Sequence, residues 1–504
     1  MKDTVSLVGA YYSGKSVLVT GATGFMGKVL IEKFLHSCHD VKAIYVCVRN
    51  SKMGRNRVRE ELPNFHEKIK PISAEFTKPN LAISSEDMEE MLSEVNVIFH
   101  CAATVRFDEP LKDALLLNVM GTQQLLRLAH QMKNLEALIH VSTAYSNCNR
   151  RHIEEVFYPV PVEPKKLLEL VWMDGSLIEA ITPNLIGDWP NTYTFSKALT
   201  EYLIQQEKGD LNVAIIRPSI VGASWQEPFP GWIDNFNNIS GSFVASGKGI
   251  LQTVKCNPAA LADIIPVDLA INLTIAAGWY TAMHRPESPL IFNCTSGNLN
   301  PLCWREIEIH VRNTFEKNPL EKPFRIPNIT ITSNYLVHQY WTFVHHTIPA
   351  FLCDLHLRYF YSVFQDDEAI YCLEKAMSHL EYFTSHSWDW SSENANMLMK
   401  ELNPKDKNVK LRTRVHLNIF CNKQTNKYLI EEMDTHIHPL FPSLLSLLCF
   451  IRLKTIHCAL KATLFVIIWC IFTARSKVAQ NLWYFLLNLC YKFFSYARHC
   501  TLRH

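Results

Sequence analysis

The sequence places a tyrosine and a lysine four residues apart, at Tyr193 and Lys197. On a helix, positions i and i+4 lie on one face, so the ammonium would lie beside the phenol, lower its pKa and help it donate a proton. Ser142 and Thr143 follow an apolar run upstream, and their hydroxyls could bind a carbonyl oxygen as it gains negative charge. Because this spacing recurs by chance, the pair predicts reductive chemistry only together with a cofactor site.

A glycine-rich turn near the N-terminus predicts that cofactor site. Gly21, Gly24 and Gly27 lie between an apolar run and a helical pattern. Such glycines allow a tight turn, close approach of a pyrophosphate, and close packing of helix on strand, and the helix N-terminus attracts the phosphates. The residues predicted to bind the dinucleotide here are Thr20, Gly21, Thr23, Gly24, Phe25, Met26 and Gly27.

Further along, the residue types favour NADPH over NADH. Arg49 ends the second apolar run, where an NAD enzyme would place a carboxylate for the ribose hydroxyl, and arginine suits the 2′-phosphate of NADP. Ala102 and Ala103 leave room for adenine and ribose, and Asn118 begins the next predicted helix. We predict that these residues, with Lys197 on the nicotinamide ribose, complete the NADPH site.

Short β-branched runs alternate with helical stretches from Lys15 onward, which is typical of a parallel sheet with crossover helices. The predicted strands are 16–20, 43–48, 95–100, 137–142 and 213–217. Shorter strands and loops at 265–268 and 291–301 are assigned to a smaller substrate lobe. The fold class is therefore α/β, a Rossmann-like doubly wound parallel sheet with a substrate lobe.

Three domains are predicted along the 504 residues. Residues 10–335 form the NADP-binding reductase domain with its substrate lobe, and residues 336–434 form an aromatic-rich helical domain. Residues 435–504 contain no Asp or Glu while Lys and Arg recur between apolar runs. Basic flanks suit anionic lipid, and 456–474 approaches the length of a spanning helix. The tail is therefore predicted to attach to a membrane, with buried soluble helices as the alternative.

Composition argues against several classes of protein. Lys plus Arg number 50 against 48 Asp plus Glu, which gives no field suited to nucleic acid. The 15 cysteines are scattered and are interpreted as reduced thiols; no cluster has metal-ligand spacing, so no metal is predicted. The first ten residues do not resemble a secretory signal, so the catalytic region is expected to face the cytosol.

Several longer motifs resemble those of one family, the fatty acyl-CoA reductases. These are Thr20 to Gly27, His100 to Asp108, Val141 to Asn147, Tyr193 with Lys197, and Ile216 to Trp232. The similarity covers roughly 10–400, is closest to the mammalian peroxisomal members, and continues through Tyr382-Phe383 and Trp388-Asp389-Trp390.

The resemblance implies two successive hydride transfers from NADPH, which reduce a long-chain fatty acyl-CoA to an aldehyde and then to a primary alcohol for ether-lipid or wax synthesis. Tyr193 would donate the proton, Lys197 would lower its pKa, Thr143 with Ser142 would bind the oxyanion, and Arg217 to Trp232 would line the acyl or CoA entrance. It also implies a location at the peroxisomal membrane and contact with membrane lipid. Both a monomer and a homo-oligomer are compatible with the sequence.

The chain departs from the family pattern at three places. Residues 50–66 form a shorter segment than expected, Glu75-Phe76 replaces an Asp-Leu pair, and 415–429 lacks the expected Trp and Tyr. Two alternatives therefore stay open. One is another extended short-chain oxidoreductase, such as a sterol dehydrogenase, and the other is a weakly active or inactive paralogue that binds membrane lipid.

Overall fold

The computed structural model describes residues 6–48, 67–235, 238–297, 300–320, 323–349, 368–404 and 406, with isolated positions between 452 and 492. Its centre is a seven-stranded sheet in the order β11-β7-β5-β4-β1-β2-β3. Every strand pair in this sheet is parallel. The predicted fold class is confirmed, and the strand order reverses between β1 and β4, where ligands bind in such sheets.

The seven strands of the main sheet are nearly all buried, which explains their apolar, β-branched sequences. They are β1 (Ser16–Thr20), β2 (Ala43–Val48), β3 (Ile69–Ser73), β4 (Val97–His100), β5 (Ala137–Val141), β7 (Val213–Pro218) and β11 (Leu290–Cys294). Leu290–Cys294 overlaps the 291–301 segment that the sequence assigns to the substrate lobe. That assignment is wrong for β11, because this strand pairs with β7 and ends the main sheet.

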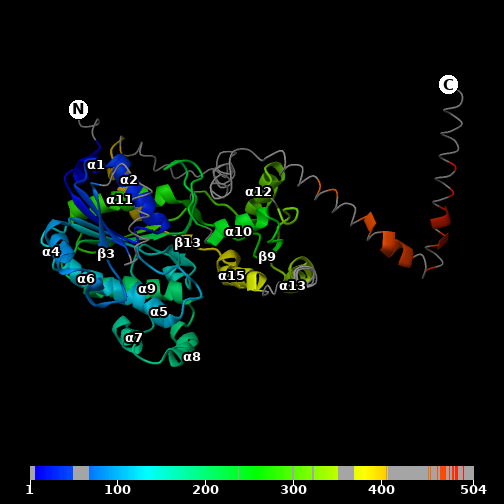
Figure 1. Ribbon diagram of the computed structural model, residues 1–504, viewed down its shortest axis with the longest axis horizontal. Helices are drawn as coiled ribbons and strands as arrows, with labels where there is room; N and C mark the ends of the chain where they lie inside the picture. The colour runs from blue at the N-terminus through cyan, green and yellow to red at the C-terminus, as the bar shows by residue number, and fades with distance from the viewer. Residues whose placement is uncertain are drawn as a thin grey trace, which may run out of the picture.

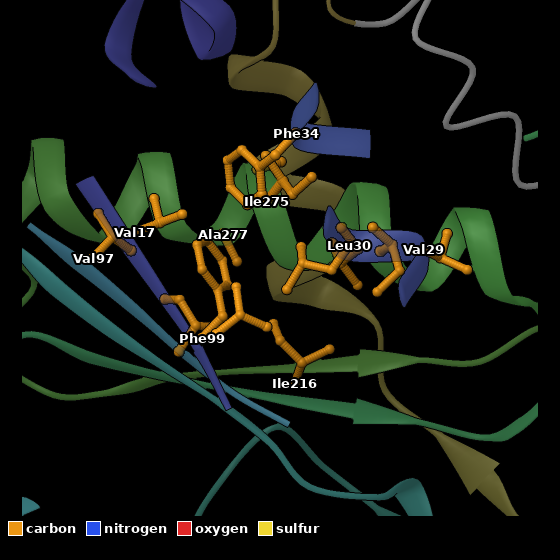
Figure 2. Packing of buried hydrophobic residues seen from close by; sticks show 14 of the residues in the cluster. Val17, Val29, Leu30, Phe34, Val97, Phe99, Ile216, Ile275 and Ala277 are labelled. Carbon is orange, nitrogen blue, oxygen red and sulfur yellow. The ribbon is translucent and has the colours of Figure 1, made fainter. Parts of the chain in front are cut away.

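Helices cover both faces of the sheet (Figure 1). On one face α2 (Phe25–Ser37) and α11 (Val267–His284) pack on the strands through a core that includes Leu30, Phe34 and Phe99, part of which is drawn in Figure 2. On the other face lie α4 (Ser85–Glu94), α6 (Gly121–Ala129) and α9 (Thr192–Glu207). This packing on the two faces of the sheet fixes the position of α2, which begins in the glycine turn, and of α9, which carries the Tyr-Lys pair.

The remaining described elements lie at the termini, in the connections and in the substrate lobe. The helices are α1 (Leu7–Tyr12), η2 (Pro79–Ala82), α5 (Leu111–Ala114), η3 (Leu115–Met120), η4 (Ala144–Asn147), α7 (Pro164–Leu170), α8 (Gly175–Ile186), α10 (Asn238–Gly247), α12 (Trp304–Lys317), α13 (Tyr335–Thr342), η5 (Phe343–Thr347), α15 (Glu368–Ser385) and α16 (Glu393–Glu401). The strands are β6 (His152–Ile153), β8 (Ile220–Gly222), β9 (Thr253–Lys255), β10 (Ile264–Pro266), β12 (Thr330–Thr332) and β13 (Asp389–Trp390).

The substrate lobe has its own core around Leu251, Trp304 and Phe315. In it β8 pairs with β10 and β9 with β12. The segment after α15 returns to the reductase domain, where β13 pairs with β6. The C-terminal helical region is thus joined to the sheet domain by backbone hydrogen bonds as well as by side chains.

Only some positions of the tail are described. Among the residues that the structure describes, no helix is both long enough and apolar enough to cross a bilayer. Most of 435–504, including most of the 456–474 segment, lies outside the described residues, so membrane attachment stays a prediction.

Candidate functional site

One cavity of about 1060 Å³ brings together the glycine turn and the Tyr-Lys pair. It opens along the carboxyl ends of the central strands and extends to the substrate lobe. Among the predicted site residues, its lining contains Gly21, Thr23, Gly24, Phe25, Met26, Gly27, Ala102, Ala103, Ser142, Thr143, Tyr193 and Lys197. The separate sequence motifs therefore meet in one place.

The glycine turn forms a backbone cradle that side chains would fill. Gly21 has φ +70°, and a Cβ there would lie 2.7 Å from the amide nitrogen of Ala102. A Cβ on Gly27 would lie 2.2 Å from the carbonyl oxygen of Gly21. Gly24 is the N-cap of α2 and has no side chain with which to cap the helix N-terminus, and it lines the cavity. The cradle fits a pyrophosphate, which needs close backbone approach and unpaired N–H groups.

Thr20 and Asn118 lie behind the cavity wall, where each supports the loop after β4. The Thr20 hydroxyl oxygen accepts from the Ala102 amide at 3.1 Å and lies 2.8 Å from Nδ1 of His100. Asn118 accepts from the Thr104 amide at 2.9 Å through Oδ1 and donates to Ser196 Oγ at 2.9 Å. Both side chains therefore support the loop that carries Ala102 and Ala103. The predicted contact of Thr20 and Asn118 with the cofactor stays a prediction.

Two further predictions about this region have different outcomes. Asn118 does not begin its helix, as the sequence suggested, because α5 starts at Leu111 and Asn118 lies in the π-helical η3. Phe76, part of the departure from the family pattern, lines the cavity and stacks on His100 with ring centroids 5.8 Å apart. Arg49 and the segment 50–66 lie outside the described residues.

Tyr193 and Lys197 both extend from the first turns of α9 toward the end of β5. Asn191 caps this helix by accepting from the Thr194 amide. Burial raises the pKa of Tyr193 to about 12, and a hydrogen bond with Thr143 acts in the opposite direction. The ammonium of Lys197 donates to the Val141 carbonyl oxygen at 2.8 Å. In this structure, then, Thr143 is the side chain that favours ionisation of the Tyr193 phenol.

Burial also lowers the pKa of Lys197 to about 8, although the neighbouring Cys101 and Glu201 raise it. Above that pH the amine is neutral before the anionic dinucleotide binds. We therefore expect dinucleotide affinity to fall as pH rises through about 8, by about tenfold per pH unit, because binding must then be coupled to uptake of a proton.

The measurement is a fluorescence titration of the dinucleotide between about pH 7 and about pH 9.5, a range in which an exposed lysine would stay charged. Lys197→Arg, which keeps its charge, is the control and should bind with little dependence on pH. An affinity that stays constant in the unaltered protein would contradict the role of Lys197.

Ser142 lines the cavity, but its hydroxyl is engaged behind it. The hydroxyl donates to the Glu201 carboxylate, which forms a buried ion pair with Arg217 at 2.6 Å. Arg217 also donates to the carbonyl oxygens of Glu154 and Val156. Because the Ser142 hydroxyl donates within this Ser142–Glu201–Arg217 network, Thr143 is the better candidate to bind the oxyanion.

The network corrects one expectation from the family resemblance. Arg217 was expected to line the acyl or CoA entrance, but its side chain is fully buried. Its charge is compensated by Glu201, because a guanidinium out of contact with water requires a partner. Of the segment that begins there, Pro218, Ser219, Ile220 and Val221 reach the cavity.

The far end of the cavity is apolar and aromatic. Phe107 stacks on Tyr193 with centroids 5.8 Å apart and approaches Phe383 at 5.2 Å. Phe383 belongs to α15, whose Leu380 and Thr384 also line the wall, opposite Ile239 and Trp304. The C-terminal helical region thus contributes directly to the cavity next to Tyr193, and an apolar ligand fits this end.

Three of these residues were not identified from the sequence. Glu201 lies on α9 at a spacing of four after Lys197, and that acid at helical spacing was an available signal. Phe107 and Phe383 are about 5 Å apart but far apart in the chain, so no local pattern predicts their contact.

Residues 19–274 and 345–409 match the NAD-binding and Sterile parts of the family described as male sterility protein. "Fatty acyl-CoA reductase 1" of Homo sapiens is 51% identical over 97% of this chain and 98% of its own length. "Fatty acyl-CoA reductase 2" of Bos taurus is 49% identical over 98% of this chain and 99% of its own length.

Among solved structures, the terminal R domain of the myxalamid PKS-NRPS biosynthetic pathway is similar, with a TM-score of 0.53 and 20% identity, over 77% of this chain and 85% of that one. This similarity shows the fold alone. The sequence identity, the family match and the cavity that joins a dinucleotide cradle to Tyr193 and Lys197 agree with one another, and the chain belongs to the fatty acyl-CoA reductase family.

Proposed function

We propose that this protein reduces long-chain fatty acyl-CoA to the primary alcohol through an aldehyde, with NADPH as the reductant. The observation that carries the proposal is the single cavity, in which a dinucleotide cradle, a Tyr-Lys pair and an apolar aromatic end lie together. The names of the relatives agree with this substrate class.

In the first reduction, the thioester carbonyl would lie between Thr143 and Tyr193. When bound, the dinucleotide would supply a hydride to the carbonyl carbon. The oxygen gains negative charge there, and prepositioned hydroxyl donors stabilise it. The C–S bond then breaks and CoA leaves as a thiolate, which takes up a proton, so the products are an aldehyde and free CoA.

In the second reduction the aldehyde carbonyl would occupy the same position. With a second hydride supplied in the same way, Tyr193 would give its phenolic proton to the oxygen, and the product would be the alcohol. Lys197, on the same face of α9, holds positive charge beside the phenol that has lost its proton. The apolar wall of Phe107 and Phe383 would hold the first carbons of the chain and exclude water.

The test is consumption of NADPH by the purified protein with acyl-CoAs of increasing chain length, with products identified by mass. The proposal expects two NADPH oxidised per alcohol formed. A steady reduction of a sterol ketone, or binding of acyl-CoA without turnover, would instead support the alternative oxidoreductase or the inactive lipid-binding paralogue.

The choice of NADPH rests on Arg49, the residue that follows Val48 in the sequence. Arg49→Ala should remove most of the preference for NADPH over NADH, because a charge-assisted contact with the 2′-phosphate is worth about 1.5 to 3 kcal/mol. The measurement is kcat/KM with each cofactor. Arg106, which pairs with Asp108 on the surface, is the control position, and Arg106→Ala should leave the preference unchanged. Equal use of both cofactors by the unaltered protein would refute the assignment.

We further propose that the tail attaches the protein to the peroxisomal membrane with its catalytic region in the cytosol, where the alcohol would enter ether-lipid or wax synthesis. The proposed partners at the membrane are lipid molecules and a second copy of the chain in a homo-oligomer. The support is the acid-free, apolar sequence of 435–504.

Removal of 435–504 should move the protein to the soluble fraction and leave dinucleotide binding intact, since the cradle and sheet lie upstream. Fractionation and a binding titration would measure both properties. A full-length protein that salt alone removes from membranes would contradict insertion of the tail.

A further inference from the structure

The helix formed by α13 and η5 turns His338 and His346 toward the protein and a row of large apolar side chains toward solvent, where Gln339 and Thr347 are exposed as well. On the inner side, Nε2 of buried His346 accepts from the Gln252 amide at 3.1 Å, and His338 lies 3.5 Å from the Thr253 hydroxyl. On the outer side, Leu336 is 75% exposed, Tyr340 59% and Phe343 56%. A surface helix of a water-soluble protein normally has the opposite polarity.

We propose that this outer side, which we call the apolar helix face (Leu336, Tyr340 and Phe343, with Tyr335, Val337 and Ile348), lies in the headgroup region of a membrane. Its residues are the types enriched at a bilayer interface, where aromatic rings combine an apolar body with a polar edge. Interfacial helices bury such a face at the boundary between headgroups and acyl chains.

A single helix face is too small to serve as a stable contact with a second copy of the chain. The helix Tyr335–Thr347 is roughly 20 Å long, and its outward face covers on the order of 200 Å². A stable protein interface buries about 800 Å² on each partner. Contact with lipid does not require a matching partner surface of this area, because lipid molecules surround any apolar side chains that enter the bilayer.

The charges around the helix also fit anionic lipid. Between Arg325 and Asp354 the sequence has no Asp, Glu, Lys or Arg. Two cations lie at the edge of the helix. Arg325 donates to the His345 carbonyl oxygen at 2.6 Å, and the Lys255 ammonium, which also pairs with Glu381 at 2.7 Å, lies 5.2 Å from the centre of the Tyr335 ring. Cations beside an uncharged apolar face suit a bilayer with a negative surface.

This contact would bring the apolar end of the cavity close to lipid. Strand β9 contacts both α13 and α15, and α15 carries Phe383 into the cavity wall. In Figure 1 these elements lie together, well away from α1. The inference adds a second membrane contact to the proposed tail, and it does not depend on the tail.

The test is photo-crosslinking of the full-length protein mixed with vesicles of phosphatidylcholine and phosphatidylserine. Benzoylphenylalanine in place of Phe343 keeps an aromatic side chain at an exposed position, so folding should not suffer. Benzoylphenylalanine in place of Met283, which is 60% exposed on α11 near α1, is the control with equal exposure. We expect lipid adducts, identified by mass, to be several-fold more abundant at position 343 than at position 283.

A second variant tests the face itself. Leu336→Glu with Tyr340→Glu should lower the lipid adducts at position 343 several-fold and leave dinucleotide binding unchanged. Equal lipid adducts at both positions, adducts at 343 to a second copy of the chain, or no adducts at 343 would overturn the proposal. Failure of the tail prediction alone, with lipid adducts still formed at 343, would leave this proposal supported.

Discussion

Tyr193→Phe should lower alcohol formation by about 10²-fold to 10⁴-fold, the range for loss of a general acid. The phenol is buried, and its hydroxyl is hydrogen-bonded with Thr143 at the end of β5. Phenylalanine keeps the stacking on Phe107 and removes only the proton donor. Dinucleotide binding should therefore survive.

The two reductions should respond differently to this change. CoA thiolate is a good leaving group, so part of the first reduction should persist with Thr143 alone, whereas the aldehyde oxygen needs a proton from Tyr193. Single-turnover oxidation of NADPH with acyl-CoA and, separately, with fatty aldehyde measures each step. Tyr202→Phe, on the same helix, is the control and should keep full activity. An unaltered rate of aldehyde reduction in Tyr193→Phe would show that another group donates the proton.

Arg217→Met should lower the free energy of unfolding by about 3 to 5 kcal/mol, the usual cost of breaking a buried ion pair from one side. The exposed side-chain fractions of Arg217 and Glu201 are 0% and 3%. The change would leave the Glu201 carboxylate buried with Ser142 alone, and would leave the carbonyls of Glu154 and Val156 without their donor.

Urea unfolding followed by near-UV circular dichroism would measure this loss. Lys42→Met is the matched control, because it breaks the exposed ion pair with Glu94 and should cost about 1 kcal/mol or less. The double variant Arg217→Met with Glu201→Gln should recover part of the stability, since no unpaired charge remains. Equal losses in Arg217→Met and Lys42→Met would mean that the buried pair contributes no more than a surface pair.

The central fold could be predicted because its signals are local. The runs 16–20 and 43–48 coincide with β1 and β2, since strands buried on both faces need continuous apolar sequence. The assignment of 291–301 to the substrate lobe is wrong where it overlaps β11, because the residues of a strand do not show which sheet the strand joins. The glycine turn could be predicted as well, because a tight turn with φ +70° at Gly21 and no room for a Cβ requires glycine at that position.

The predicted site was less complete, for a physical reason. Tyr193 and Lys197 share one helix, so their spacing places them together. The sequence suggested that Ser142 binds the oxyanion, but in the fold its hydroxyl donates to Glu201. The resemblance suggested that Arg217 lines the entrance, but in the fold its side chain is buried. Those contacts depend on tertiary packing between distant segments, for which the sequence has no periodic signal.

The pairing of β13 with β6 has a consequence for how the protein is made. Trp388 donates to the carbonyl oxygen of Cys148, which lies 240 positions earlier, and Phe383 packs beside it against Tyr145. A ribosome adds about 5 to 20 residues per second, so on the order of tens of seconds separate the synthesis of these two sides. During that interval the aromatic wall beside Tyr145 is half built and open to water. A nascent chain that has not yet reached the Trp388–Trp390 segment therefore lacks these aromatic contacts beside Tyr145.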